Sequence, residues 1–148
     1  MAYTSLIYHI VFSTKGRVPM ISRETLPRIC EYIGGIIRGV DGQMLGANGM
    51  ADHLHVATIG NPNIAVTKLL QLIKGNSSKW IHETIPELRP MYWQEAYGAF
   101  SVSPSALPEL LAYIAGQEEH HRRHTFQEEF LALLERHGVK YDPRYIWR

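Results

Sequence analysis

The sequence contains a single cysteine, Cys30, so neither an internal disulfide nor a zinc site built on several cysteines can form. No apolar stretch approaches the length needed to span a bilayer. The N-terminus also lacks the basic region followed by an apolar run that marks a signal peptide. These absences predict a protein that works in a reduced, cytoplasmic setting.

The chain also lacks a strong charge bias, internal repeats, linkers and low-complexity segments. Its formal net charge is +1 at pH 7. This balance neither indicates nor excludes nucleic-acid binding, because only the local field of a groove matters. With 148 residues, 45% of them hydrophobic, the chain is long enough for one domain with a sizeable core and too short for two comfortable ones. We therefore expect one domain over residues 1–148.

The hydrophobic pattern alternates between the period of a strand and the period of a helix. It predicts the order β-α-β-β-α-β-α-α, and the short turns favour an antiparallel sheet with helices packed on it, an α+β fold. The expected strands cover residues 3–14, 43–49, 53–59 and 91–102, the last one interrupted at Gly98, and the expected helices cover residues 23–40, 63–81, 105–124 and 125–138.

Turn and cap residues refine these bounds. Asn63 can cap the second helix, and Pro108 fits only in the first turn of the third helix. Residues 125–128 match a capping box, and Gly138 is placed to end the fourth helix. The tail, residues 139–148, is too aromatic for a disordered end, so we expect it to dock on the rest of the protein.

The most informative motif is His53-Leu54-His55, which lies in one of the predicted strands. Side chains alternate between the two faces of a strand, so His53 and His55 point the same way. Two imidazoles side by side can hold one divalent metal. Taken alone, the motif is more often a pair of polar residues on the wet face of a strand.

Tyr113 and Gln117 stand four residues apart, so they share one face of the predicted third helix. Considered alone, they indicate a partly buried aromatic residue and a surface amide. His120 and His124 have the same spacing, but they lie at a helix end that nothing fixes. The lone histidines His9 and His82 are expected to serve packing or to lie on the surface.

The ordered set of segments resembles the single-tyrosine HUH transposases, small enzymes of bacterial insertion sequences and their repeat-associated relatives. HUH stands for histidine, hydrophobic residue, histidine. The resemblance runs nearly end to end, and the matching segments are residues 8–17, 52–55, 74–79, 93–103, 113–117, 120–121 and 141–145.

The resemblance implies a ferredoxin-like or RRM-like HUH core and assigns roles to individual residues. His53 and His55 match the two histidine metal ligands, and Gln117 matches the polar residue that completes the metal site. Tyr113 matches the nucleophile that forms a 5′-phosphotyrosine with single-stranded DNA. Pro108 is unusual so close to the start of that helix, and it could alter how the helix is hinged.

The resemblance also implies partners. The expected substrate is single-stranded DNA with hairpins at the element ends, and the expected assembly is a homodimer in which the tyrosine helix can complete the partner's site. The expected host is a bacterium or an archaeon. The expected metal is Mg²⁺ or Mn²⁺; Mn²⁺ tolerates imidazole better, whereas Mg²⁺ prefers oxygen. Phosphate contacts are assigned to four cationic residues in the matched segments: Lys15, Arg17, Lys74 and Lys79.

Two alternatives stay open at this point. A metal-dependent phosphodiesterase could use His53 and His55 with an activated water, and it would form no covalent adduct through Tyr113. A non-catalytic hairpin-binding regulator would bind DNA without metal dependence or cleavage.

Overall fold

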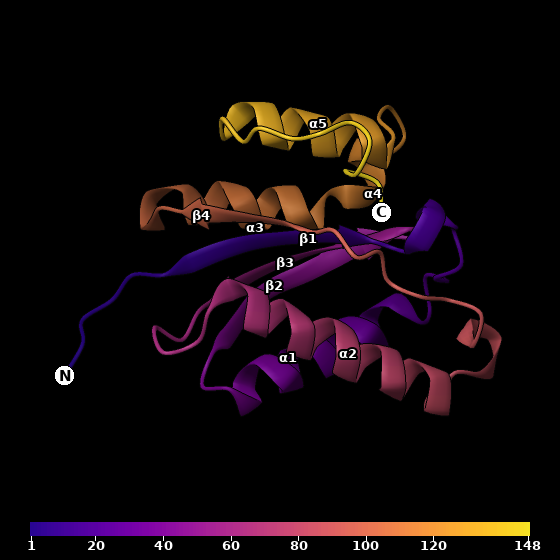
Figure 1. Ribbon diagram of the computed structural model, residues 1–148, viewed down its shortest axis with the longest axis horizontal. Helices are drawn as coiled ribbons and strands as arrows, with labels where there is room; N and C mark the ends of the chain where they lie inside the picture. The colour runs from indigo at the N-terminus through magenta and orange to yellow at the C-terminus, as the bar shows by residue number, and fades with distance from the viewer.

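The computed structural model describes residues 1–148 and has three layers, with a four-stranded sheet between two layers of helices (Figure 1). Helices α1 and α2 cover one face of the sheet, and α3 and α5 lie on the other. The elements are β1 (Ile7–Ser13), η1 (Lys15–Arg17), α1 (Leu26–Gly39), β2 (Gln43–Met50), β3 (His53–Ile59), α2 (Val66–Thr84), η2 (Pro86–Leu88), β4 (Gly98–Val102), η3 (Pro104–Ala106), α3 (Leu107–Ala115), α4 (Gln117–His120) and α5 (Phe126–Arg136).

The sheet has the strand order β2-β3-β1-β4, and every neighbouring pair is antiparallel. Together with the chain order β-α-β-β-α-β, this confirms the α+β prediction and is the arrangement of a ferredoxin-like core. In the register of β1 with β3, Ser13 lies opposite His53 and Val11 lies opposite His55. The pleat sends these four side chains to the α5 side of the sheet, while Leu54 points to the α1/α2 side.

Each face of the sheet has its own hydrophobic core. The larger core fills the space between the sheet and the α1/α2 layer and includes Phe12, Ile33 and Ile73, all fully buried or nearly so. The smaller core lies under α5 and includes Val11 and Phe130. The side chains of His53 and His55 on β3 therefore face the smaller core, which α5 covers.

The structure corrects several predicted bounds. The first strand begins at Ile7 and not at residue 3, and only Gly98–Val102 of the expected strand over 91–102 is a regular strand. Asn63 does not cap α2: the N-cap is Ala65, which makes no side-chain cap. The third helix stops at Ala115, because Gly116 leaves the helical conformation, and it resumes as the short α4.

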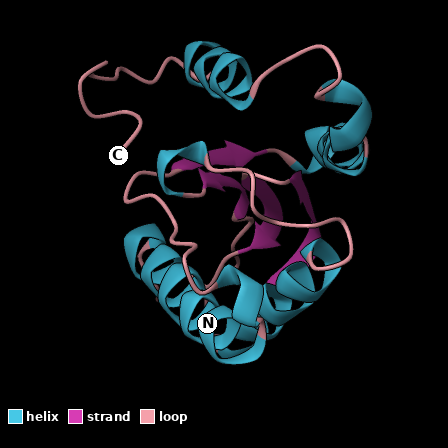
Figure 2. Cartoon of the chain, turned by 90° about the vertical axis from the view of Figure 1, so that its right-hand side faces the viewer, coloured by secondary structure: helices cyan, strands magenta, loops and turns pink.

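The C-terminal segment docks as expected (Figure 2). The Thr125 capping box is present and starts α5, and Gly138 follows its end with a φ of 65°. Beyond α5 the chain turns back, Ile146 is buried, and the carbonyl of Arg148 accepts a hydrogen bond from the Ala96 amide at 2.7 Å. No helix of the protein combines the length and the apolar character needed to cross a membrane.

Candidate active site

Strand β3 carries His53 and His55, and both side chains are completely buried. The turn between β2 and β3 is tight at this point. Gly49 lies so close to the carbonyl of His53 that a Cβ atom would collide with it. The two imidazoles are therefore fixed on a backbone that has little room to move.

Each of these imidazoles is oriented through its Nδ1 atom. His53 Nδ1 donates to Asp52 Oδ1 at 2.7 Å, and His55 Nδ1 lies 2.8 Å from Nε2 of His9. Burial, together with the neighbouring His55, lowers the pKa of His9 to about 3, so the His9 ring is neutral and carries one donor nitrogen and one acceptor nitrogen. Both Nε2 atoms then point away from the strand. A hydrogen-bond partner on Nδ1, the ring nitrogen that does not face the site, is typical of histidines that ligate metals.

The two Nε2 atoms converge on a carboxylate from α5, Glu129, whose side chain is 1% exposed. Glu129 Oε1 lies 2.8 Å from His55 Nε2, 3.3 Å from His53 Nε2 and 3.1 Å from His121 Nε2. The second oxygen, Oε2, accepts a hydrogen bond from Gln117 Nε2 at 3.1 Å and another from the hydroxyl of Tyr113. One carboxylate thus joins the imidazoles to the phenol.

Helices α3 and α4 bring Tyr113 and Gln117 to this carboxylate despite the break at Gly116. The end of α3 is held by Asn48 of β2, whose Nδ2 donates to the carbonyl of Ile114 at 3.0 Å. Gln117 is fully buried, and its Oε1 lies 3.0 Å from His53 Nε2. The phenol and the histidine pair therefore meet within one protomer.

The charges of this cluster are strongly perturbed. Burial opposes protonation of His53, but hydrogen bonds to Asp52 and Glu129 outweigh it and raise the pKa of His53 to about 9. Burial alone would raise the pKa of Glu129, yet hydrogen bonds from His121, His53 and His55 hold it far below its usual range. Burial and the contact with Glu129 raise the pKa of Tyr113, so the phenol is protonated at neutral pH.

The residues fit a divalent cation. Single donor atoms of His53, His55, His121 and Glu129 all lie within 4.8 Å of one another, and the Gln117 oxygen lies beside them. Imidazole nitrogens with amide or carboxylate oxygens are a donor set suited to divalent ions such as Mn²⁺. Because His53 carries an extra proton in this geometry, a metal ion bound there would displace that proton.

The structure brings together all four residues that the sequence singled out for metal and nucleophile: His53, His55, Tyr113 and Gln117. The sequence analysis did not assign Glu129 or His121 to this cluster. His9 is buried as a packing residue, but it is not a lone histidine, since its Nε2 lies 2.8 Å from Nδ1 of His55. His82 does serve packing, with its Nε2 2.6 Å from the carbonyl of Met91.

A signal for Glu129 was present in the sequence. The buried residues of α5 are Phe126, Glu129, Phe130, Leu133 and Leu134, which repeat at the spacing of one helix face. A carboxylate on the apolar face of an amphipathic helix needs a partner inside the protein. This position therefore pointed to a buried polar site.

The four residues assigned to phosphate contacts lie apart from the histidine cluster, and no hydrogen bond or ion pair joins them to it. Lys15 and Lys79 are exposed. Arg17 donates to the carbonyl of Trp147 at 3.1 Å and so holds the C-terminal tail. Lys74 donates to the carbonyl of Glu95 at 2.8 Å, and burial lowers its pKa.

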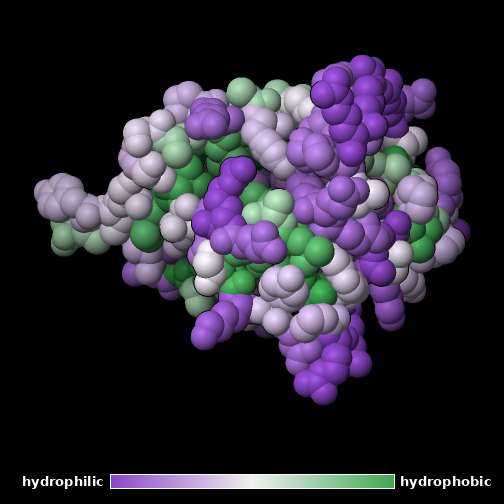
Figure 3. All heavy atoms as spheres, turned by 90° about the horizontal axis from the view of Figure 1, so that it is seen from above, coloured by the Kyte–Doolittle hydropathy of each residue, from purple (hydrophilic) through white to green (hydrophobic).

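Two hollows flank the cluster. One, of about 550 Å³, borders Tyr113 and His9 and is also lined by the exposed Arg136. The other, of about 470 Å³, borders Asp52 and His121. The face that carries α3 and α5 shows hydrophobic patches between strongly hydrophilic groups (Figure 3). The nucleophile can therefore be approached from outside.

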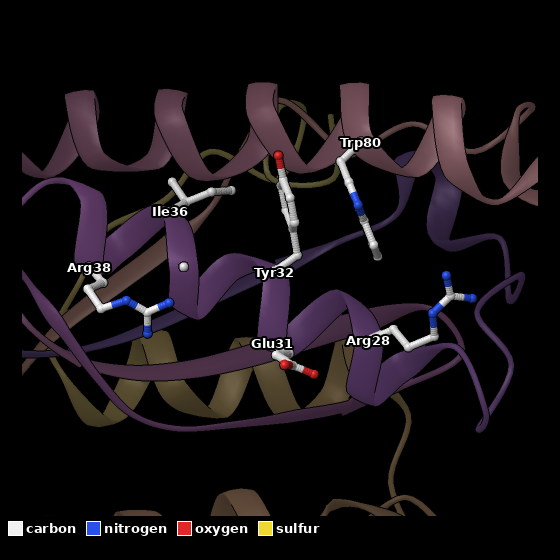
Figure 4. Close-up of a pocket in the computed structure, with 7 residues that line it drawn as sticks. Arg28, Glu31, Tyr32, Ile36, Arg38 and Trp80 are labelled. Carbon is white, nitrogen blue, oxygen red and sulfur yellow. The ribbon is translucent and has the colours of Figure 1, made fainter.

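A further hollow, of about 660 Å³, lies on the α1/α2 layer, behind the sheet from the histidines. Tyr32 of α1 stacks on Trp80 of α2 with ring centroids 4.5 Å apart, and Arg28 lies over Trp80 (Figure 4). This surface has no metal-ligating cluster.

Comparison with known proteins agrees with this geometry. Residues 2–117 match the family described as "Transposase IS200 like", whereas His121 and Glu129 lie beyond the matched range. Among curated proteins no match was found.

Two solved structures share the fold. A candidate transposase from Deinococcus radiodurans R1 superposes with a TM-score of 0.65 at 21% identity, covering 79% of this chain and 95% of that chain. A REP-associated tyrosine transposase bound to a REP hairpin gives a TM-score of 0.61 at 11% identity, covering 82% of this chain and 74% of that chain.

Proposed function

The chain belongs to the IS200-like transposase family, and from that premise we propose that it cuts and rejoins single-stranded DNA through a 5′-phosphotyrosine on Tyr113. His53, His55 and Gln117 bind a divalent metal beside the nucleophile. The observation that carries this proposal is the meeting of the Tyr113 hydroxyl and the two Nε2 atoms on one carboxylate.

The cleavage step forms one bond to phosphorus and breaks another. The hydroxyl oxygen of Tyr113, oriented by its hydrogen bond to Oε2 of Glu129, attacks the phosphorus and releases its proton to solvent. The bond from phosphorus to the 3′-oxygen breaks, and a free 3′-hydroxyl leaves. In the joining step the oxygen of a 3′-hydroxyl attacks the phosphorus, the bond from phosphorus to the Tyr113 oxygen breaks, and the proton lost by the 3′-hydroxyl is balanced by the one that the phenol takes up. The covalent bond conserves the phosphodiester energy, so no nucleotide cofactor is needed.

A divalent metal, Mg²⁺ or Mn²⁺, would neutralise charge on the phosphate oxygens when bound. Hydrogen bonds within the protein hold the side chains that would bind the metal in place. Asp52 and His9 hold the two imidazoles in one orientation, and Gln117 is buried with its oxygen directed at His53. The raised pKa of Tyr113 is consistent with a nucleophile that stays protonated until this charge is in place.

The DNA enters from the hollow beside Tyr113, where the exposed Arg136 offers a cation to the phosphate backbone. We extend to this chain the recognition of a DNA hairpin, because a relative of the same fold is bound to one. Exposed Lys15 and Lys79 remain candidates for phosphate contacts outside the site. A homodimer is also part of the proposal, although Tyr113 reaches the histidines within its own protomer.

The deciding experiment incubates labelled single-stranded DNA carrying flanking hairpins with the protein, in Mn²⁺ or in EDTA, and reads the products on a denaturing gel. We expect a covalent protein–DNA adduct that requires Mn²⁺ and disappears in Tyr113→Phe. Tyr145→Phe, which changes an exposed tyrosine of the tail, is the matched control and retains the adduct.

The two alternatives have different signatures in the same assay. Cleavage that persists in Tyr113→Phe without any adduct would indicate a phosphodiesterase that uses water. Hairpin binding that is equal in Mn²⁺ and EDTA, without cleavage, would indicate a regulator.

A further inference from the structure

Glu129 is the least expected member of the site. It comes from α5, beyond the segment that matches the transposase family, and its side chain is 1% exposed. A buried carboxylate costs several kcal/mol unless it is paired or coordinates a metal. Its surroundings therefore show what the protein uses it for.

The partners of the ring nitrogens around Glu129 are the decisive observation. His53 Nδ1 faces a carboxylate oxygen of Asp52, and His121 Nδ1 faces the carbonyl of His124 at 2.7 Å. Both partners can only accept, so both Nδ1 atoms must carry the proton. The neutral form of each ring then turns an unprotonated Nε2 toward Glu129 Oε1, and lone pairs that face an anionic oxygen repel it. Either extra protons or a cation must lie between them.

The spacing of the donors favours a cation. Divalent ions bind nitrogen and oxygen ligands at about 2.1 Å, so two ligands at right angles lie about 3 Å apart. Glu129 Oε1 lies 2.8, 3.1 and 3.3 Å from Nε2 of His55, His121 and His53. Gln117 Oε1 adds a fifth donor, 3.0 Å from His53 Nε2.

We propose that Glu129 and His121 are metal ligands, which the C-terminal segment adds to the set of His53, His55 and Gln117. This inference rests on the proposed metal site but not on the DNA chemistry. The carboxylate makes the site anionic, so it holds a divalent ion more tightly than imidazoles and an amide alone. Its second oxygen touches Tyr113 and Gln117, so the same residue ties the metal to the nucleophile.

A structural consequence follows for α5. The helix supplies one ligand, and the segment just before it supplies another, while the remaining ligands sit on β3 and α4. Binding the ion therefore stabilises the packing of α5 on the sheet. An ion that binds only when α5 is packed on the sheet stabilises that packing, by thermodynamic linkage.

The test measures Mn²⁺ binding to the full chain by isothermal titration calorimetry, with no DNA present. We expect Glu129→Gln and His121→Asn each to weaken Mn²⁺ binding about tenfold or more, a loss at least as large as that seen when partners of metal ligands are removed. Glu135→Gln, an exposed carboxylate on the same helix, serves as the matched control and leaves the affinity unchanged. Wild-type affinity in both Glu129→Gln and His121→Asn would overturn the proposal.

A second measurement covers the possibility that Glu129→Gln disturbs folding. Hydrogen exchange of the α5 amides in the wild-type protein should slow when Mn²⁺ is added, while α1, which is remote from the site, should not change. Equal exchange of α5 with Mn²⁺ and with EDTA would also overturn the proposal. Tyr113→Phe should abolish the adduct and still bind Mn²⁺, because it removes none of the proposed ligands, so the adduct and metal binding report separately on the two proposals.

Discussion

The protonated His53 makes the stability of the metal-free protein depend on pH in an unusual direction. Its pKa is raised from 6.5 to about 9 in the folded chain. Between these values the folded protein holds a proton that the unfolded chain has released, so stability falls as the pH rises. Below pH 6.5 the His53 contribution is fully present, and above pH 9 it is lost.

The size of the effect follows from the shift. The rise of the His53 pKa from 6.5 to about 9 corresponds to about 3 kcal/mol. The low pKa of Glu129 arises from the same interaction. We therefore expect the free energy of unfolding in EDTA to drop by about 2–3 kcal/mol between pH 6.5 and pH 9 through this histidine.

Urea denaturation in EDTA, followed by tryptophan fluorescence at several pH values, measures this drop. His53→Gln removes the titrating group, so its stability should be nearly flat over the same range. Saturating Mn²⁺ should reverse the trend in the wild-type protein, because the ion displaces the proton and binds better at higher pH. Parallel curves for wild type and His53→Gln in EDTA would refute the assigned role of this proton.

Three further changes test other parts of the structure. Thr125→Ala removes the capping box of α5 and should cost about 1 kcal/mol of unfolding free energy in urea; an unchanged midpoint would contradict the cap. Gly49→Ala should cost about 1–3 kcal/mol and weaken Mn²⁺ binding, because its Cβ would collide with the carbonyl of His53. Replacing Lys15 and Lys79 by alanine should flatten the salt dependence of hairpin binding by about one to two units of slope, and an unchanged slope would reject both as phosphate contacts.

The sequence was most informative where the residue pattern is local. Alternation placed His53 and His55 on one face of β3, and the capping box placed the start of α5. Both depend on neighbours within a few residues. The break of the third helix at Gly116 was not predicted, although glycine is a weak helix former, and the regular helix ends at Ala115.

The residues that the sequence analysis misjudged act over long separations. His9 meets His55 only because β1 pairs with β3, and Glu129 reaches both only because α5 folds over the sheet. The sequence itself shows that His9 lies among apolar residues of a predicted strand and that Glu129 lies on the apolar face of a predicted helix. What the sequence could not show was that they belong to the same site.

The site draws its side chains from residue 9 in the first strand to residue 129 in the last helix, so all of that stretch must be made before the cluster is complete. A nascent chain that has left the ribosome only as far as α3 carries both strand histidines and the tyrosine, but not the carboxylate that joins them. If Glu129 serves as proposed, such a nascent chain binds the divalent ion more weakly than a chain that has also made α5.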